Sequence, residues 1–104
     1  MAFLLFYVTY PDEATAQQIA TEMVEKRLAA CANIFPVSSA YWWHGAVQQE
    51  NEWVSVLKTR PELEFHLEEA IKQIHPYEVP CILRFEVRGN AAYEKWIVGS
   101  TTIP

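Results

Sequence analysis

The segment from Phe3 to Tyr10 constrains the fold most, because Thr9 is its only residue that is neither aliphatic nor aromatic. A strand with one face in solvent alternates apolar and polar residues, whereas a strand buried on both faces lacks this alternation. The segment ends at Pro11-Asp12, which marks a turn and offers a helix N-cap. It therefore predicts a central strand that is covered on both faces.

Two stripes of apolar residues at helical spacing predict two amphipathic helices. The first follows Asp12, and the second follows Pro61, a residue favoured at the first helical position. The second helix is expected to stop at His75, because the residue before Pro76 is disfavoured in the helical region. The stripes consist of Ile19, Ala20, Met23, Val24 and Leu28, and of Leu63, Leu67, Ala70, Ile71 and Ile74.

The residues between the two helices predict a long β-hairpin. Its arms cover residues 31–43 and 47–58, and His44-Gly45 makes the turn between them. Pro36 interrupts the first arm, which places this arm at a sheet edge or at a bulge.

The predicted order of elements is βαββαβ, completed by a strand over residues 82–87 and a short helix over residues 92–98. This order is typical of the α+β ferredoxin-like split βαβ sandwich, in which two helices cover one face of an antiparallel sheet. Residues 1–104 thus form a single domain. Because no local element covers the other face, we expect another subunit to bury it in a closed homo-oligomer.

Composition and charge exclude several classes of partner. Eight Lys and Arg stand against thirteen Asp and Glu, giving a formal net charge of −5, so no basic face suits nucleic acid or an anionic membrane. No apolar run is long enough to span a bilayer and none resembles a signal peptide, which favours the cytoplasm. Four Trp, five Tyr and five Phe exceed what so small a core holds, so we expect aromatic contacts with another chain.

Three side chains are candidate ligands for a soft metal ion. Cys31 is either a thiolate ligand or nucleophile, or a small buried hydrophobe. His75 is either a ligand held in a rigid loop or a histidine that satisfies the last carbonyls of its helix. Cys81 lies six residues further on, and a firm site with His75 would need more ligands from Cys31 or from a neighbouring chain.

The hairpin carries further candidate site residues. Tyr41, Trp42 and Trp43 at its tip could stack on a planar ligand, but aromatic residues are enriched at subunit interfaces, which favours docking against a neighbour. Glu52 and Lys58 share one face of the second arm by the period of two. They could line a cleft or form a structural ion pair.

No catalytic motif supports an enzymatic activity. The sequence contains no GxGxxG, GxxxxGK[ST], GxSxG or HExxH pattern. A hydrolase built on Cys31 and His75 would need both side chains within about 3 Å of each other in an open pocket.

Five segments together resemble the CutA family of divalent-cation tolerance proteins. They follow the family's order and spacing over essentially the whole chain. The segments are RLAACANI at 27–34, SxYxWxG at 39–45, Glu52 with Leu57-Lys58-Thr59, HPYxxP at 75–80 and YxxWI at 93–97.

The resemblance implies a ferredoxin-like homotrimer similar in plan to PII signalling proteins, a cytoplasmic location and a link to tolerance of copper and other divalent cations. It carries over Cys31 and His75 as candidate copper ligands. This chain has Cys81 where family members commonly have an acidic residue, which would favour Cu(I) over a hard cation. It has His44 where many members have Glu, which adds one possible ligand and removes another.

Two hypotheses follow. In the first, the protein is a non-enzymatic homotrimer of metal tolerance that binds copper, as Cu(I) or Cu(II), or another divalent cation through Cys31, His75 and Cys81. In the second, it is a PII-like trimeric sensor or scaffold that binds a small organic anion in clefts between subunits. The residues expected to line these clefts are Tyr41, Trp43, Glu52, Lys58, His75 and Tyr77.

Overall fold

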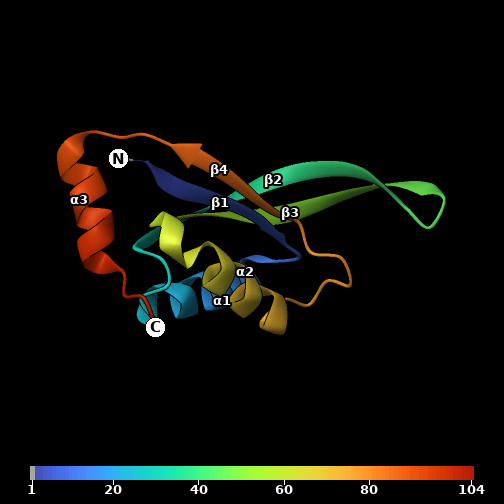
Figure 1. The fold of residues 1–104 in the computed structure, drawn as a ribbon. Helices are drawn as coiled ribbons and strands as arrows, with labels where there is room; N and C mark the ends of the chain where they lie inside the picture. Colours follow the sequence, from blue (N-terminus) through green and yellow to red (C-terminus); the bar gives the residue numbers. More distant parts are fainter. Residues whose placement is uncertain (1) are drawn as a thin grey trace.

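The structure, a computed structural model, describes residues 2–104 and confirms the predicted α+β ferredoxin-like fold (Figure 1). Within these residues, an antiparallel sheet is covered on one face by two helices, and a third helix lies at one end. The elements are β1 (Phe3–Tyr10), α1 (Glu13–Glu25), β2 (Cys31–Trp43), β3 (Ala46–Thr59), the 3-10 turn η1 (Pro61–Leu63), α2 (Glu64–Ile74), β4 (Ile82–Val87) and α3 (Ala91–Ser100).

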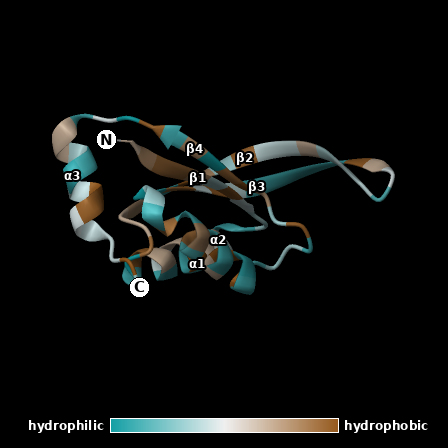
Figure 2. Cartoon of the chain, in the orientation of Figure 1, coloured by the Kyte–Doolittle hydropathy of each residue, from teal (hydrophilic) through white to brown (hydrophobic). Residues whose placement is uncertain are grey.

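Strand β1 is central, as its sequence predicted. The strand order is β2-β3-β1-β4, and Leu5 of β1 lies opposite Lys58 on one side and Phe85 on the other. In Figure 2, β1 is brown toward its N-terminal end and paler toward its C-terminal end, whereas α1 and α2 alternate between brown and teal. This difference is what burial of a central strand and of one helix face requires.

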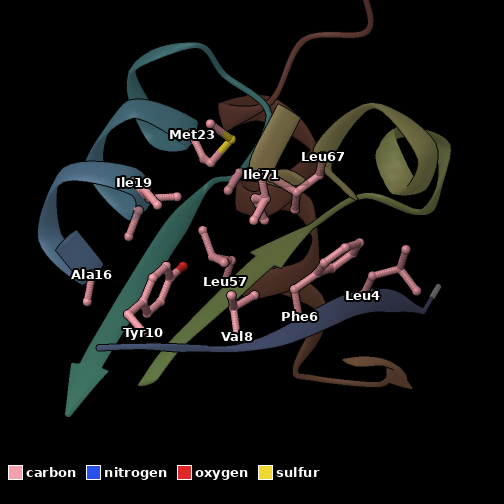
Figure 3. Close-up of a cluster of buried hydrophobic side chains, with 12 residues drawn as sticks. Leu4, Phe6, Val8, Tyr10, Ala16, Ile19, Met23, Leu57, Leu67 and Ile71 are labelled. Atoms are coloured by element: carbon pink, nitrogen blue, oxygen red, sulfur yellow. The ribbon is translucent and has the colours of Figure 1, made fainter. Parts of the chain in front are cut away.

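The core lies between the sheet and the two helices. Alternate residues of β1 point toward the helices: Phe6 lies toward Leu67 of α2, and Tyr10 lies on the side of Ile19 of α1 (Figure 3). The buried hydroxyl of Tyr10 is satisfied by a 2.7 Å hydrogen bond with the hydroxyl of Ser55. The helix-covered face of the sheet is therefore a closed, satisfied core.

The other residues of β1 face away from the helices. Leu5 and Tyr7 are half-buried, and on the neighbouring β4 the side chains of Leu83 and Phe85 are exposed. We call this side the open face. Cover on both faces of β1, which the sequence predicted, is thus found on one face only within the described part of the chain.

Strands β2 and β3 form the predicted long hairpin, which extends beyond the rest of the sheet (Figure 1). Pro36 lies opposite Trp53 in an unbroken register, so the proline is tolerated because β2 is an edge strand and not because of a bulge. At the turn, His44 and Gly45 both have positive φ, at 49° and 78°. Positive φ at both central residues matches the twist of the strands that such a turn joins.

The helix boundaries follow local signals. The carboxylate of Asp12 caps α1 by accepting a 2.7 Å hydrogen bond from the backbone N–H of Thr15. Helix α1 ends earlier than its apolar stripe suggested: Arg27 adopts a left-handed φ of 62°, and Leu28 packs on the core from outside the helix. Helix α2 ends at His75, as the following proline predicted. Within residues 2–104, no helix has both the length and the apolar character needed to cross a membrane.

Two apolar positions on α2 test the assignment of the core. Leu67 is fully buried, whereas Phe65 is 70% exposed. Leu67→Ala should lower the free energy of unfolding by about 2–5 kcal/mol because it leaves a cavity. Phe65→Ala, the matched control, should change it by about 0.5 kcal/mol or less. Denaturant titration measures both, and equal losses would contradict the assigned helix orientation.

Candidate functional site

A cleft of about 750 Å³ lies on the open face, where the loop 75–81 meets the hairpin. Thr9, Glu52 and Tyr41 occupy positions in the strand register whose side chains share this face. The cleft is lined by Thr9, Ser38, Ser39, Ala40, Tyr41, Trp43, Gln48, Glu50, Glu52, Pro76, Tyr77, Glu78, Val79 and Cys81.

Glu52 is the buried charge of this cleft. Only 6% of its surface is exposed, and its Oε2 accepts a 2.6 Å hydrogen bond from the hydroxyl of Tyr77. Burial and the hydrogen bond to Glu52 raise the pKa of Tyr77, so its hydroxyl stays protonated and donating at neutral pH. Among the described residues, no Lys, Arg or His forms an ion pair with Glu52.

The charged residues of the lining are all acidic. The lining contains the carboxylates of Glu50, Glu52 and Glu78, and none of its residues is Lys, Arg or His. Carboxylates gathered in a partly enclosed cleft create a negative potential that attracts cations and repels anions.

His75 fixes the loop that closes the cleft. Its Nε2 lies 2.7 Å from the carbonyl oxygen of Thr9, and its Nδ1 accepts a 3.1 Å hydrogen bond from the backbone N–H of Tyr77. Because a carbonyl only accepts, Nε2 carries the proton and the ring is the neutral tautomer. The ring also stacks on Tyr10, with centroids 5.2 Å apart.

This geometry corrects the expectation for His75. Both ring nitrogens are engaged, so in this arrangement neither is free to bind a metal ion. The alternative, a histidine that satisfies the last carbonyls of its own helix, is also corrected: the imidazole bonds to the carbonyl of Thr9 in β1. Burial lowers the pKa of His75, which favours the neutral ring that both hydrogen bonds need.

Cys31 lies at the opposite end of the sheet. It pairs with Lys58, which pairs with Leu5, whereas His75 and Cys81 lie beside Thr9. From the position of Leu5, which is level with Cys31, to Thr9 is four residues along β1, or about 14 Å. The two strand spacings between β2 and β1 add about 10 Å across the sheet. One chain therefore cannot join Cys31 to the other two candidate ligands in one site, nor pair it with His75 for hydrolysis.

Lys58 is likewise absent from the cleft. Its Nζ donates a 2.6 Å hydrogen bond to Oδ1 of Asn33 and lies 5.8 Å from the ring centroid of Tyr93, whose hydroxyl is 3.4 Å from Sγ of Cys31. Six residues of β3 separate Lys58 from Glu52, which is about 20 Å along the strand. The shared face was predicted correctly, but the strand is too long for the two charges to meet.

Cys81 lines the cleft beside Glu52. Burial and the charge of Glu52 raise the pKa of the Cys81 thiol, and a hydrogen bond with Thr9 partly offsets this rise. The thiol is therefore protonated at neutral pH. Among residues 2–104, no three His, Cys, Asp or Glu side chains converge to hold a metal ion, so one chain supplies only part of a metal site.

The structure brings together four of the six residues predicted for a ligand cleft. Tyr41, Trp43, Glu52 and Tyr77 line it, and His75 adjoins it through a ring contact with Tyr77 at 4.9 Å. Trp42 lies on the other side of β2 and is 74% exposed.

The sequence analysis missed Glu78 as a lining residue. A signal was present: Glu78 is a charged residue inside a short segment bounded by Pro76 and Pro80, where the backbone is rigid enough to place a side chain.

The family model for the CutA1 divalent ion tolerance protein matches residues 4–100. The chain belongs to this family. The divalent-cation tolerance protein CutA of Pyrococcus horikoshii is 38% identical over 99 residues, which are 94% of this chain and 97% of that protein. The crystal structure of CutA1 from the same organism superposes with a TM-score of 0.93 at 37% identity, covering 96% of this chain and 99% of that one.

The comparisons confirm the resemblance and the fold. The family name concerns tolerance of divalent ions and not a catalysed reaction. A further similar structure, that of Archaeoglobus fulgidus CutA, has a TM-score of 0.90 at 36% identity, covers 96% of this chain and 98% of that one, and is described as periplasmic. The cytoplasmic location of the present chain stays a prediction.

The neutral His75 ring makes stability depend on pH. Because its pKa is lowered on folding, the unfolded chain binds the proton more tightly, so the free energy of unfolding should fall as pH drops below about 6.5. His75→Gln keeps a donor for Thr9 but cannot titrate, so this loss should disappear in the variant. Denaturant midpoints between pH 7.5 and 5 measure this loss of stability. The same pH dependence in both proteins would contradict the assignment of a neutral His75 ring.

Proposed function

We propose that this chain is a non-enzymatic, homotrimeric protein of divalent-cation tolerance whose acidic cleft binds copper, as Cu(I) or Cu(II), or another divalent cation. One observation carries the proposal: within residues 2–104, the carboxylate of Glu52 is buried in the cleft with a hydrogen bond from Tyr77 but without an ion-pair partner. Buried charges in proteins are ordinarily paired or bound to metal ions. A cation in the cleft would supply the missing charge.

The donor types in the cleft fit copper. The thiol of Cys81 is a soft ligand that suits Cu(I), and the carboxylates of Glu52 and Glu78 suit harder divalent ions. A bound copper ion would supply positive charge and affinity for sulfur, and binding would release the proton of the thiol. Cys81 with one of these carboxylates therefore replaces the sequence-based set of Cys31, His75 and Cys81 as the part of the site that one chain supplies.

The open face supports the homotrimer. Phe35, Leu83 and Phe85 are each more than a third exposed and share this face with Leu5 and Tyr7, so apolar side chains from three strands gather there. Exposed apolar side chains gathered on one face favour an interface, and other copies of the chain in a closed ring would cover them without leaving a free face. Because the cleft opens on the same side, a neighbour would also border it and could add ligands.

The second hypothesis, a sensor of small organic anions, is not favoured by the cleft. An anion would face three carboxylates, and Lys58, the cation expected to hold it, lies at the far end of β3. The hydrolase that the sequence allowed loses its support within one chain, because Cys31 and His75 lie too far apart to form a nucleophile–base pair.

Two cysteine variants test the metal site. Cys81→Ser should weaken Cu(I) binding at least about tenfold, because a soft ligand is lost, whereas Cys31→Ser should leave the affinity unchanged. The affinity of the unmodified protein should rise with pH, because the Cys81 thiol must lose its proton. Competition with a chromophoric Cu(I) chelator measures these affinities. A loss confined to Cys31→Ser would return the site to the other end of the sheet.

The assembly is tested by mass in solution. Multi-angle light scattering should give three times the 12.0 kDa of one chain. Phe85→Glu should shift the mass toward one chain, because it buries a charge in the apolar interface. Phe65→Glu makes the same change on α2, away from the open face, and should leave the mass unaltered. A monomeric mass for the unmodified protein would rule out the trimer.

A further inference from the structure

The acidic cleft is far larger than a metal ion requires. Its volume of about 750 Å³ falls within the range of roughly 300–1,000 Å³ that is usual for sites of small organic molecules. A metal ion bound at Glu52 and Cys81 would occupy one corner and leave the rest to solvent. The other residues that line the cleft therefore indicate what kind of organic ligand would fit it.

Three aromatic side chains line the cleft. Tyr41 and Trp43 lie two residues apart on one face of β2, and Tyr77 comes from the loop 75–81. Within a single chain, Tyr41 and Trp43 are more than a third exposed. The faces of such rings attract cations, ammonium groups among them, and the rings also pack against methylene groups.

The carboxylates of the cleft are arranged along one strand. Glu50 and Glu52 occupy alternate positions on β3, so their Cα atoms are about 7 Å apart on the same face. Glu78 adds a third negative charge from the loop. A ligand that satisfies this lining needs more than one positive charge and an apolar body between the charges.

We propose that this cleft binds an aliphatic polyamine, whose ammonium groups pair with Glu50 and Glu52 and lie against the ring faces of Tyr41 and Trp43, with its methylene chain between them. The inference rests on the proposed function, because it uses the same cation-attracting cleft. It goes beyond that function in assigning the aromatic wall, which a metal ion does not need. Metal and polyamine share Glu52, whereas Cys81 serves only the metal and the rings serve only the polyamine.

Calorimetric titration of the full-length, chelator-treated protein with putrescine and with spermidine tests the proposal. Spermidine should bind more tightly than putrescine because it carries one more charge, and 1,4-butanediol, which lacks the charges, should not bind. Binding should weaken as salt is raised. Equal responses to spermidine and to Mg²⁺ at matched ionic strength would overturn the proposal, because they would show unspecific screening of the carboxylates.

Matched variants separate this inference from the metal site. Tyr41→Leu should weaken spermidine binding about fivefold, whereas Tyr41→Phe, which keeps the ring, should retain it. Glu52→Gln should weaken spermidine and copper alike. Cys81→Ser should weaken the binding of copper but not that of spermidine. If the unmodified protein binds spermidine but not copper, the metal site is refuted and this proposal stands. Undiminished spermidine binding in both Tyr41→Leu and Trp43→Leu would refute the aromatic wall and with it the proposal.

Discussion

The imidazole of His75 joins the parts of the molecule that form the cleft. The residue ends α2, and its ring stacks on Tyr10 of the core. The ring also donates a hydrogen bond to the carbonyl of Thr9 and accepts one from the backbone N–H of Tyr77. The contacts with Tyr10 and Thr9 tie the loop 75–81 to β1, and the hydrogen bond from Tyr77 holds the loop itself in a turn. The loop can therefore hold Tyr77 against Glu52 at the end of the sheet, which is what closes the cleft on one side.

The buried charge and the apolar surface that we propose as an interface lie on the same face of the sheet. Glu52 lies on the open face with the apolar side chains of Leu5, Leu83 and Phe85. An apolar neighbour drawn to that surface would lower the local dielectric constant and make an unpaired carboxylate more costly. A bound cation would offset this cost, so subunit packing and cation binding would strengthen each other.

The two cysteines show how strand register separates chemically similar groups. In sequence, both flank a strand and both are plausible soft ligands. In the structure, Cys31 lies beside Lys58 and Tyr93 at the end near α3, and Cys81 lies beside Thr9 in the acidic cleft. Their different surroundings give them different chemistry, although neither forms a disulfide.

The sequence by itself determined the order and nearly all the boundaries of the elements. Those signals are local: the unbroken apolar run from Phe3 to Tyr10, the cap at Asp12, the turn at His44-Gly45 and the stop before Pro76. Only the tertiary structure decided which candidate site residues meet. Contacts such as Thr9 with His75, or Glu52 with Tyr77, join residues 66 and 25 positions apart. Strand register and loop geometry set these contacts, and no periodicity along the chain encodes them.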